Sequence, residues 1–310
     1  MIGLVVQEPT AAAAVARIKQ AEDAGVPAVW MTIGGAGGAD PMATFAAAGA
    51  QTSSVLMGTA IVPNMPRHPI IMAQQAVAVA QLAPGRFRLG IGPSHQTTMQ
   101  NTFGFDFNKP LTRLGEYMDI VDALLTDGQV DVDGQFYTAH TRTPSAPDVP
   151  LMASALRSAS FEFCGARGIP ALSWVCPSAY LRDSALPAIR RGADKAGRDA
   201  PPLIAHVPVC ITEDRDAVRE AVRAQLANYP RAPFYVRMFT DAGYPEASEG
   251  TWSDGMIDGT VVWGNREEVA DGLHRWLSYG FGELMAHPVI AGDDREGALA
   301  DVMQVIAAAN

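Results

Sequence analysis

The stretch from Met57 to His95 constrains the fold most, because two apolar runs of strand length flank one apolar run of helix length. The first strand-like run opens the segment MGTAIVPNMPRHP (57–69), and the second opens RFRLGIGPSH (86–95). Each breaks into Gly, Pro and polar residues at its end. Between them, IIMAQQAVAVAQL (70–82) contains no proline. A strand, a helix and a second strand predict a βα unit and therefore a parallel sheet.

The same alternation continues along the chain. Strand-like runs are expected at residues 1–6, 28–32, 55–61, 87–91, 150–153, 171–175, 203–211 and 283–286. Helical patterns are expected at residues 10–24, 41–50, 70–82, 111–125, 159–165, 214–226 and 297–309. This repetition predicts an α/β fold, a single (β/α)8 TIM barrel that spans residues 1–310. In such a barrel the loops that follow the strands carry the chemistry.

Three segments interrupt this alternation. Residues 126–148 contain the pair Asp133-Gly134, which favours a β-hairpin. Residues 227–257 are long enough to form a lid-like insert over the C-terminal mouth of the barrel. The glycine-rich loop Gly34–Gly38 is expected to be mobile.

Composition narrows the classes of partner. Hydrophobic residues make up 48% of the 310 residues, enough to fill the core of one barrel. The net charge of −10 argues against nucleic acid and anionic membranes as partners, and no apolar run is long enough to cross a membrane. The three isolated cysteines predict buried free thiols in a reducing cytoplasm and no metal site. We therefore expect a cytoplasmic protein that acts on a small molecule.

The same motifs resemble a known family. Residues 57–69, with Gly-Thr, a small-aliphatic pair, Pro and an Arg-His-Pro turn, resemble the third strand of the luciferase-like flavin and deazaflavin oxidoreductases. RFRLGIGPSH resembles the fourth strand of that family, and residues 264–286 resemble the start of its eighth βα unit. The resemblance implies an oxidoreductase that uses the deazaflavin coenzyme F420, and we expect a homodimer. An FMN-dependent monooxygenase and a non-catalytic flavin-binding protein on the same fold remain alternatives.

The turn after the strand at 87–91 is a candidate phosphate site. Gly92, Pro93, Ser94 and His95 follow a buried strand, where backbone N–H groups can approach a phosphate closely. The side chains of Ser94 and His95 add hydrogen-bond donors. The dinucleotide-binding fingerprint is not present, since its third glycine and its downstream acid are missing. A plain β-to-α turn is the alternative interpretation.

The resemblance also assigns cofactor-binding positions. It implies a non-proline cis peptide between Ala60 and Ile61 that packs against the deazaflavin ring, with an ordinary strand end as the alternative. After the strand at 150–153 the family carries a Gly-Pro turn, which this chain lacks. There Arg157 offers a guanidinium suited to an anionic cofactor tail, with a surface arginine as the alternative. The predicted cofactor-binding set is Thr32, Ala60, Ile61, Gly92, Pro93, Ser94, His95, Ala153, Ala155, Arg157 and Ser158.

The expected reaction follows from an acid–base residue pair that is missing at the end of the predicted strand at 28–32. The deazaflavin dehydrogenases of the family that this chain resembles carry an Asp-His or Glu-His pair at the end of their second strand. This chain has Thr32-Ile33 there. No base for a hydroxyl proton is therefore evident, which favours reduction of an activated C=C or C=N bond over alcohol oxidation. His95 and His287 are the candidate catalytic residues, as proton donors to the product. Trp174 and His287 are also candidate walls of the substrate pocket, with core packing as the alternative.

Overall fold

The computed structural model of the chain describes residues 1–33, 38–146 and 148–310, which form two compact units. Unit 1 comprises Met1–Val5, Ala24–Pro27 and Ala155–Asn310, and unit 2 comprises Val6–Asp23 and Ala28–Ser154. The loop predicted to be mobile, residues 34–38, lies outside the described residues except for its last glycine. Within the described ranges no helix is long and apolar enough to span a bilayer.

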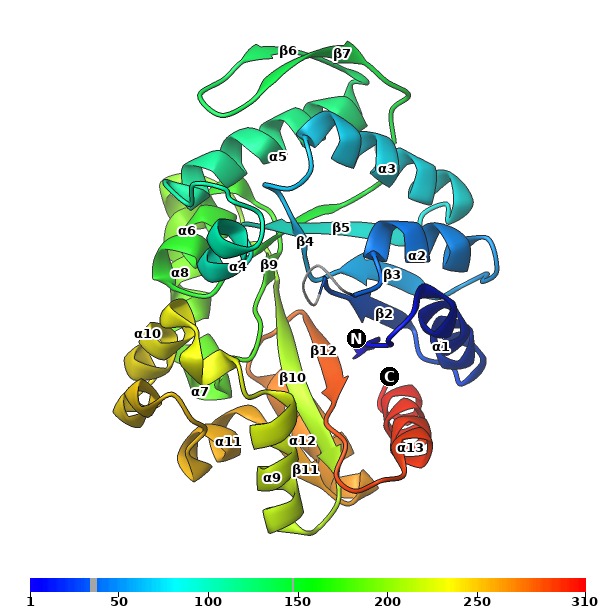
Figure 1. The fold of residues 1–310 in the computed structure, drawn as a ribbon, viewed down its shortest axis with the longest axis vertical. Coiled ribbons are helices and arrows are strands. Elements are labelled where there is room, and N and C mark those ends of the chain that lie inside the picture. The colour runs from blue at the N-terminus through cyan, green and yellow to red at the C-terminus, as the bar shows by residue number, and fades with distance from the viewer. Residues whose placement is uncertain (34–37, 147) are drawn as a thin grey trace. The chain divides into compact units, whose positions relative to one another are not determined.

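Unit 2 is built on a parallel sheet (Figure 1). Its strands run in the order β2 (Ala28–Met31), β3 (Leu56–Thr59), β5 (Phe87–Gly92) and β8 (Leu151–Ser154), and the short β4 (Val62–Pro63) also pairs with β5. The carboxyl ends of these strands therefore point the same way. The helices of this unit are α1 (Ala11–Asp23), α2 (Pro41–Gly49), α3 (Pro69–Leu82), α4 (Gln96–Asn101) and α5 (Pro110–Thr126).

Local signals set where these helices begin. Thr10 accepts a hydrogen bond at Oγ1 from the N–H of Ala13 at 3.2 Å and so caps α1. Asp40 and His68 cap α2 and α3 in the same way, by accepting backbone N–H groups of the first turn. A proline then opens α2, α3 and α5, where its fixed φ suits the first turn and its missing N–H leaves no bond unmade.

A hairpin lies beyond α5 in unit 2 (Figure 1). Strands β6 (Gln129–Asp133) and β7 (Thr138–Arg142) pair antiparallel, which confirms the hairpin predicted from its Asp-Gly pair. Glu116 on α5 accepts three consecutive backbone N–H groups of the hairpin turn at 2.6–2.9 Å. This one carboxylate therefore holds the tip of the hairpin against the helix.

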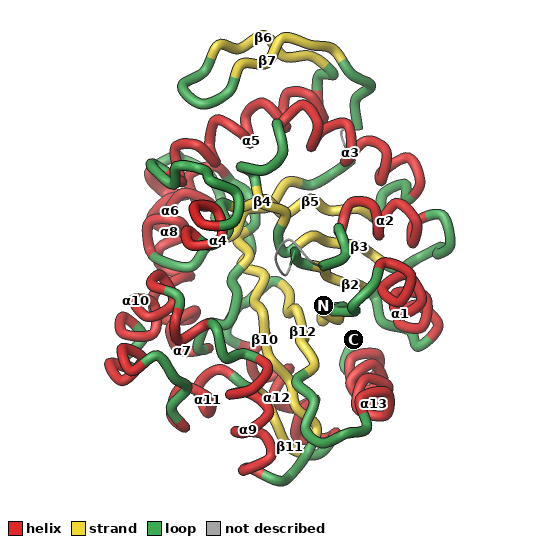
Figure 2. Tube along the Cα trace, viewed as in Figure 1, coloured by secondary structure: helices red, strands yellow, loops and turns green. Residues whose placement is uncertain are grey.

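Unit 1 also contains a parallel sheet (Figure 2). Its strands run in the order β9 (Ala171–Leu172), β10 (Leu203–Ile211), β12 (Glu283–Pro288) and β1 (Ile2–Val5), and β11 (Val262–Gly264) also pairs with β10. Its α-helices are α6 (Ser158–Arg167), α7 (Ser178–Tyr180), α8 (Leu186–Lys195), α9 (Arg215–Gln225), α10 (Pro233–Asp241), α11 (Asp254–Thr260), α12 (Arg266–Ser278) and α13 (Arg295–Ala308). Shorter helical turns are the π-helix Leu181–Ala185 and the 3-10 helices Tyr229–Arg231 and Pro245–Glu249.

Several predicted boundaries differ from the structure for local reasons. The strand predicted at 55–61 is shorter in the structure, where β3 ends at Thr59, and the short β4 follows beyond the predicted end; the strand predicted at 171–175 ends at Leu172. The polar end of the 227–257 insert forms the start of α11, because Ser253 caps that helix through the N–H of Met256 at 3.1 Å. Helices α4, α7, α8 and α12 and strand β11 are among the elements for which the sequence predicts no bounds.

Close packing in the core depends on Gly58 in unit 2. A Cβ atom at Gly58 would lie 2.4 Å from the ring of Trp30, which is fully buried. The guanidinium of Arg88 lies 4.2 Å from the centroid of the same ring, within the range of a cation–π contact. Only glycine at this point of β3 leaves room for the indole. In unit 1, all three cysteines are buried and free, as predicted: Cys164, Cys176 and Cys210.

Glu22, at the end of α1, holds the loop that leads into β3. Its Oε1 accepts the backbone N–H groups of Ser53, Ser54 and Val55 at 2.8, 2.6 and 3.0 Å. Partial burial acts to raise the pKa of this carboxyl, but the N–H donors favour the charged form more strongly and lower the pKa to about 2. The charged carboxylate therefore stabilises unit 2.

We expect the replacement Glu22→Gln to destabilise the protein near neutral pH and to matter less as the pH falls. Because the folded pKa is depressed, the contribution is fully present above the ordinary value of 4.5 and is lost as the pH falls toward about 2. Urea unfolding of both proteins at several pH values measures the gap in unfolding free energy. Asp23→Asn, which removes a charge at the next position, is the control. A gap that stays constant with pH would contradict this assignment.

Candidate functional site

The pairing of β3 and β4 with β5 in unit 2 contains a bulge. The chain advances four residues from Gly58 to Val62 but only three from their partners Arg88 to Ile91, so one residue is extra. Thr59 holds the strands together at this point, since its Oγ1 donates to the carbonyl of Gly90 at 2.9 Å and accepts the N–H of the same residue at 2.8 Å. Bulges of this kind redirect side chains at the ends of barrel strands.

The extra residue lies at the predicted cofactor-binding pair. The peptide bond between Ala60 and Ile61 is cis, which confirms the geometry implied by the family resemblance. The N–H of Ala60 donates to the carbonyl of Met31 at 2.7 Å, so the bulge is also tied to the end of β2. Thr32, the predicted site residue that follows β2, is half-buried. The structure therefore brings the ends of β2 and β3 together.

Gly92 connects the bulge to the end of β8. A Cβ atom at Gly92 would lie 2.1 Å from the Oγ of Ser154 and 3.2 Å from Cγ1 of Ile61. Ala153, another predicted site residue, is buried and pairs with Ile91. Only glycine at position 92 permits this close approach, so the predicted set in unit 2 forms one contiguous group at the carboxyl ends of the strands.

The turn after Gly92 has the backbone that the sequence suggested. Pro93 and Ser94 are half-buried, and Ser94 adopts a left-handed conformation with a φ of 61°. His95 is exposed and directly precedes α4. A left-handed residue in such a turn changes the direction of successive N–H groups, which is the arrangement that cradles anions.

Asn64 follows β4 and was not predicted as a site residue. Its N–H donates to the carbonyl of Gly92 at 3.0 Å, so it lies opposite the turn. Its side chain is fully buried, and neither the Nδ2 nor the Oδ1 atom has a hydrogen-bond partner among the residues that the structure describes. A buried amide without partners costs about 1–3 kcal/mol, so a native protein supplies it with a water molecule or a ligand. Its place inside the quoted VPNMPRHP motif is the sequence signal that could have identified it.

Acidic groups near these strands are held in ion pairs. Glu8, which follows β1, accepts from Nε of Arg17 at 2.9 Å, and both side chains are buried. Asp40 pairs with Arg67 in the turn before α3. Each carboxylate is thereby bound to a guanidinium.

The remaining predicted cofactor residues belong to unit 1. Ala155 is buried, and its N–H donates to the carbonyl of Leu172 at 2.8 Å. Arg157 precedes α6 and donates from Nε and Nη2 to Asp241 on α10 at 3.2 and 3.1 Å. Ser158 accepts from Arg191 at 3.0 Å. These two polar side chains already have protein partners, and their cofactor role remains a prediction.

Three aromatic side chains form a cluster on the strands of unit 1 and the segment after β9. His206 on β10 and His287 on β12 are hydrogen-bonded, with His206 Nε2 2.9 Å from His287 Nδ1. The ring of Trp174, which follows β9, lies over His206 with 3.7 Å between centroids. The N–H of Val175 donates to Nδ1 of His206 at 3.2 Å. The structure therefore joins the predicted residues Trp174 and His287 through His206, which lies within the strand predicted at 203–211.

Both histidines of this cluster are neutral near pH 7. Burial, and the neighbouring His287, lower the pKa of His206 far below its usual range, although the backbone of His206 acts weakly in the opposite direction. Burial lowers the pKa of His287 to about 4. Neither imidazole is a ready source of a proton.

The insert at 227–257 reaches this cluster within unit 1. Nε1 of Trp174 donates to the hydroxyl of Tyr229 at 2.6 Å, and the ring of Tyr229 packs edge-on against Tyr235 of α10. Burial raises the pKa of the Tyr229 hydroxyl to about 12, and the bond from Trp174 lowers it only in part. Tyr229 therefore stays protonated and fixes the orientation of the indole.

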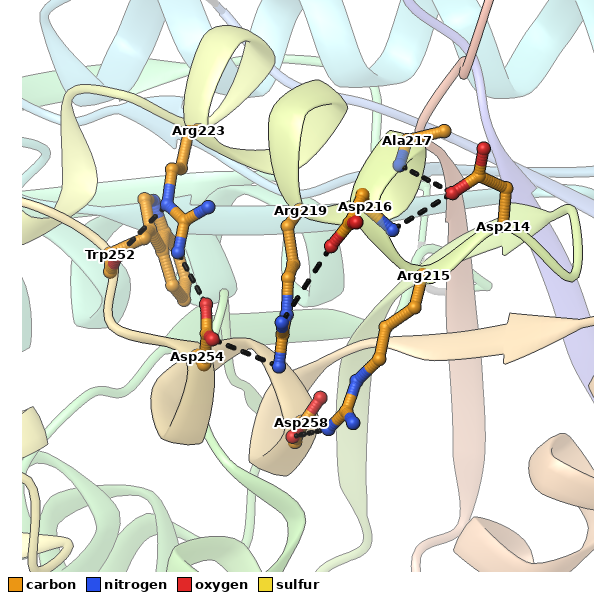
Figure 3. A network of polar contacts seen from close by, with 9 residues as sticks. All are labelled: Asp214, Arg215, Asp216, Ala217, Arg219, Arg223, Trp252, Asp254 and Asp258. Atoms are coloured by element: carbon orange, nitrogen blue, oxygen red, sulfur yellow. Dashed lines mark hydrogen bonds and ion pairs between the residues drawn. The ribbon is translucent and has the colours of Figure 1, made fainter.

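Ion pairs connect the C-terminal end of the 227–257 insert to α9 (Figure 3). Three arginines on successive turns of α9 face α11. Arg215 donates to Asp258 at 2.7 Å, and Arg219 and Arg223 share the carboxylate of Asp254. Exposed pairs contribute little singly, but a shared carboxylate makes this a network. It joins the C-terminal end of the insert to α9, whereas Tyr229 contacts the cluster from the other end.

Comparison with known proteins places these features in context. The model of the family described as luciferase-like monooxygenase matches residues 3–283. An F420-dependent glucose-6-phosphate dehydrogenase of Nakamurella multipartita is 27% identical over 274 residues, which are 82% of this chain and 77% of that protein.

Solved structures extend the comparison. An F420-dependent secondary alcohol dehydrogenase in complex with an F420-acetone adduct matches with a TM-score of 0.82 at 20% identity, covering 100% of this chain and 99% of that one. The coenzyme F420-dependent tetrahydromethanopterin reductase of Methanopyrus kandleri matches with a TM-score of 0.75 at 21% identity, covering 98% and 97%. The predicted fold class is confirmed: an α/β fold with a closed eight-stranded parallel barrel, and a small antiparallel hairpin inserted.

We expect Gly92→Ala to destabilise the protein by about 1–3 kcal/mol, because the new methyl group overlaps Ser154. Urea unfolding measures the loss. Gly255→Ala is the matched control, since the nearest atom to a Cβ there is 3.7 Å away. The double variant G92A/S154G should lose less than the sum of the two single variants, because the overlap is removed. Equal stability of Gly92→Ala and the original protein would show that the close approach is wrong.

Proposed function

The chain belongs to the luciferase-like monooxygenase family, and within it we propose an F420-dependent oxidoreductase that reduces an activated C=C or C=N bond of a small organic substrate. The similarity to proteins named as F420-dependent dehydrogenases and a reductase supports the cofactor. The observation that carries the proposal is the fully buried amide of Asn64, without partners among the described residues, beside the bulge and the glycine turn.

The residues of unit 2 fit a deazaflavin. Its ring has an edge of alternating carbonyl and N–H groups, and a carboxamide such as that of Asn64 presents the complementary donor and acceptor. The backbone N–H groups of the turn from Gly92 to His95 suit a phosphate. When bound, the reduced deazaflavin supplies a hydride.

The predicted residues of unit 2 would contact two parts of the cofactor, its ring and its phosphate. In unit 2, Ala60 and Ile61 would support the ring, while Thr32 and Ala153 would line it with small side chains. The turn formed by Gly92, Pro93, Ser94 and His95 would hold the phosphate. In unit 1, the cofactor roles of Ala155, Arg157 and Ser158 stay predictions from the sequence.

The preference for reduction rests on the groups that could remove a proton. Thr32-Ile33 occupies the end of β2, and neither residue is a base. Glu8, the carboxylate that follows β1, is bound to Arg17. General acid–base catalysis contributes about 10²–10⁴-fold, so alcohol oxidation without a base would be slow. Hydride addition to a polarised alkene or imine has no such requirement.

We expect Asn64→Leu to weaken the binding of F420 by about 5- to 150-fold, as the loss of about 1–3 kcal/mol implies. The same change should leave the protein without cofactor as stable as before, or more stable, because it removes a buried amide that has no partner among the described residues. Fluorescence titration gives the affinity and urea unfolding gives the stability. Asn101→Leu, at the exposed end of α4, is the control.

Parallel titrations of the original protein with FMN test the choice of cofactor. The proposal requires that reduced F420 bind more tightly than reduced FMN. Tighter binding of FMN, with consumption of oxygen, would reassign the chain to monooxygenase chemistry.

A substrate screen that follows the absorbance of F420 in both directions tests the reaction. We expect oxidation of reduced F420 by conjugated enones or cyclic imines and negligible reduction of F420 by secondary alcohols or sugar phosphates. Rapid reduction of F420 by an alcohol would refute the proposed direction, since a base must then act on the hydroxyl group.

A further inference from the structure

We propose that Arg157 and Asp241 form an exchangeable latch: their ion pair holds α10 against the start of α6, and α10 moves away when an external anion takes Arg157 from Asp241. Both residues belong to unit 1, as do the other contacts involved. The latch is independent of the proposed function, because it requires neither cofactor nor substrate.

The pair joins two segments that are distant in the sequence. Arg157 directly precedes α6, and Asp241 is the last residue of α10 in the 227–257 insert. Nε and Nη2 of Arg157 donate to the same carboxylate oxygen of Asp241, Oδ2, at 3.2 and 3.1 Å. The two side chains are 41% and 47% exposed, so an ion from solution can reach both of them.

Both charges lie at helix ends that disfavour them. Arg157 carries a positive charge beside the N-terminus of α6, which is the positive end of the helix dipole. Asp241 carries a negative charge at the C-terminus of α10, which is the negative end. Neither residue therefore stabilises its own helix. The contact between the two side chains explains positions that local helix stability does not.

The arginine side of the latch is fixed through its backbone. The hydroxyl of Tyr180 donates to the carbonyl of Leu156 at 3.1 Å, and the N–H of Arg157 donates to Oγ of Ser160 at 3.1 Å. The hydroxyl of Ser160 donates in turn to the carbonyl of Arg157 at 2.7 Å. The part of the latch that can move is therefore Asp241 together with α10.

Aromatic contacts of α10 lie within the insert itself. The ring of Phe239 packs edge-on against Tyr244 and Trp252, with centroids 6.4 and 5.2 Å apart. The start of the insert is bound through Tyr229 to the aromatic cluster, and its C-terminal end is bound through ion pairs to α9. Because Phe239, Tyr244 and Trp252 belong to the same insert, movement of α10 away from α6 keeps these rings packed on one another.

An exposed pair of this kind is weak enough to be exchanged. Exposed ion pairs shift an equilibrium by up to about fivefold, and salt screens them. A phosphate ion offers several acceptor oxygens to the same guanidinium, so it competes directly with the carboxylate of Asp241. The latch therefore couples the position of α10 to the presence of an anionic group at Arg157.

Distances between spin labels measure the position of α10 in the protein without cofactor. Labels at Asp194→Cys on α8 and Arg237→Cys on α10 report on the latch. Labels at Asp194→Cys and Glu220→Cys on α9 give a reference distance that should not change. The native cysteines are buried and therefore stay unlabelled.

We expect Asp241→Asn to raise the ratio of open to closed α10 about two- to fivefold, because the variant removes one charge of the pair. Asp183→Asn, which removes one charge of another exposed pair in unit 1, is the control and should leave the ratio unchanged. An unchanged distance distribution in Asp241→Asn would overturn the proposal.

Exchange of the two charges separates the pair from an effect of either residue alone. Arg157→Asp and Asp241→Arg should each open α10, because like charges then face each other, whereas the double variant R157D/D241R should close it again. In the double variant each charge also suits its own helix end, so urea unfolding should show no loss of stability. An open α10 in a stably folded double variant would refute the latch.

Inorganic phosphate tests the exchange. We expect phosphate to raise the proportion of open α10 in the original protein more than sodium chloride does at the same ionic strength. In Asp241→Asn, phosphate should act no more strongly than chloride, because the competing carboxylate is gone. Equal effects of the two salts in the original protein would mean screening alone and would overturn the exchange. An equal excess effect of phosphate in both proteins would place its action elsewhere, with the same consequence.

Discussion

The hydroxyl of Thr59 is the contact on which the arrangement of unit 2 depends. It replaces a regular ladder bond by holding both backbone groups of Gly90. With the strands joined there, the extra residue of the bulge can project without parting them. Gly92 then lets the bulge and Ser154 approach the same point, which a side chain of any size would prevent. A single polar contact and a single missing Cβ thus set the geometry of the candidate cofactor site.

Unit 1 depends on a different constraint, the fixed direction of a backbone donor. The N–H of Val175 donates to Nδ1 of His206, and Nε2 of His206 lies 2.9 Å from Nδ1 of His287. Burial lowers the pKa of both imidazoles, so each ring is uncharged at neutral pH. The insert contributes through Tyr229, which holds the indole over the first ring.

Much of the fold could be predicted because the signals are local. The helix at 214–226 is visible from its capping Asp214 and its apolar spacing, and the structure places α9 at Arg215–Gln225. The strand predicted at 203–211 has the observed bounds, since this long apolar run follows two prolines and ends at polar residues. By contrast, β9 is only Ala171–Leu172, because the left-handed Val175 that follows is imposed by contacts distant in sequence.

The sequence by itself determined the βα alternation, the glycine turn at 92–95, the Thr32-Ile33 pair after β2 and, through the family motif, the bulge at Ala60 and Ile61. These features depend on residues that are close together in the chain, where periodicity and turn residues can be recognised. Only the tertiary structure decided that Asn64 is buried without a partner among the described residues and that His206 is hydrogen-bonded to His287. Residues 206 and 287 lie on strands that are adjacent in the sheet and 81 positions apart in the chain. The two imidazole rings come into contact only when the chain folds, so their hydrogen bond cannot be read from neighbouring residues in the sequence.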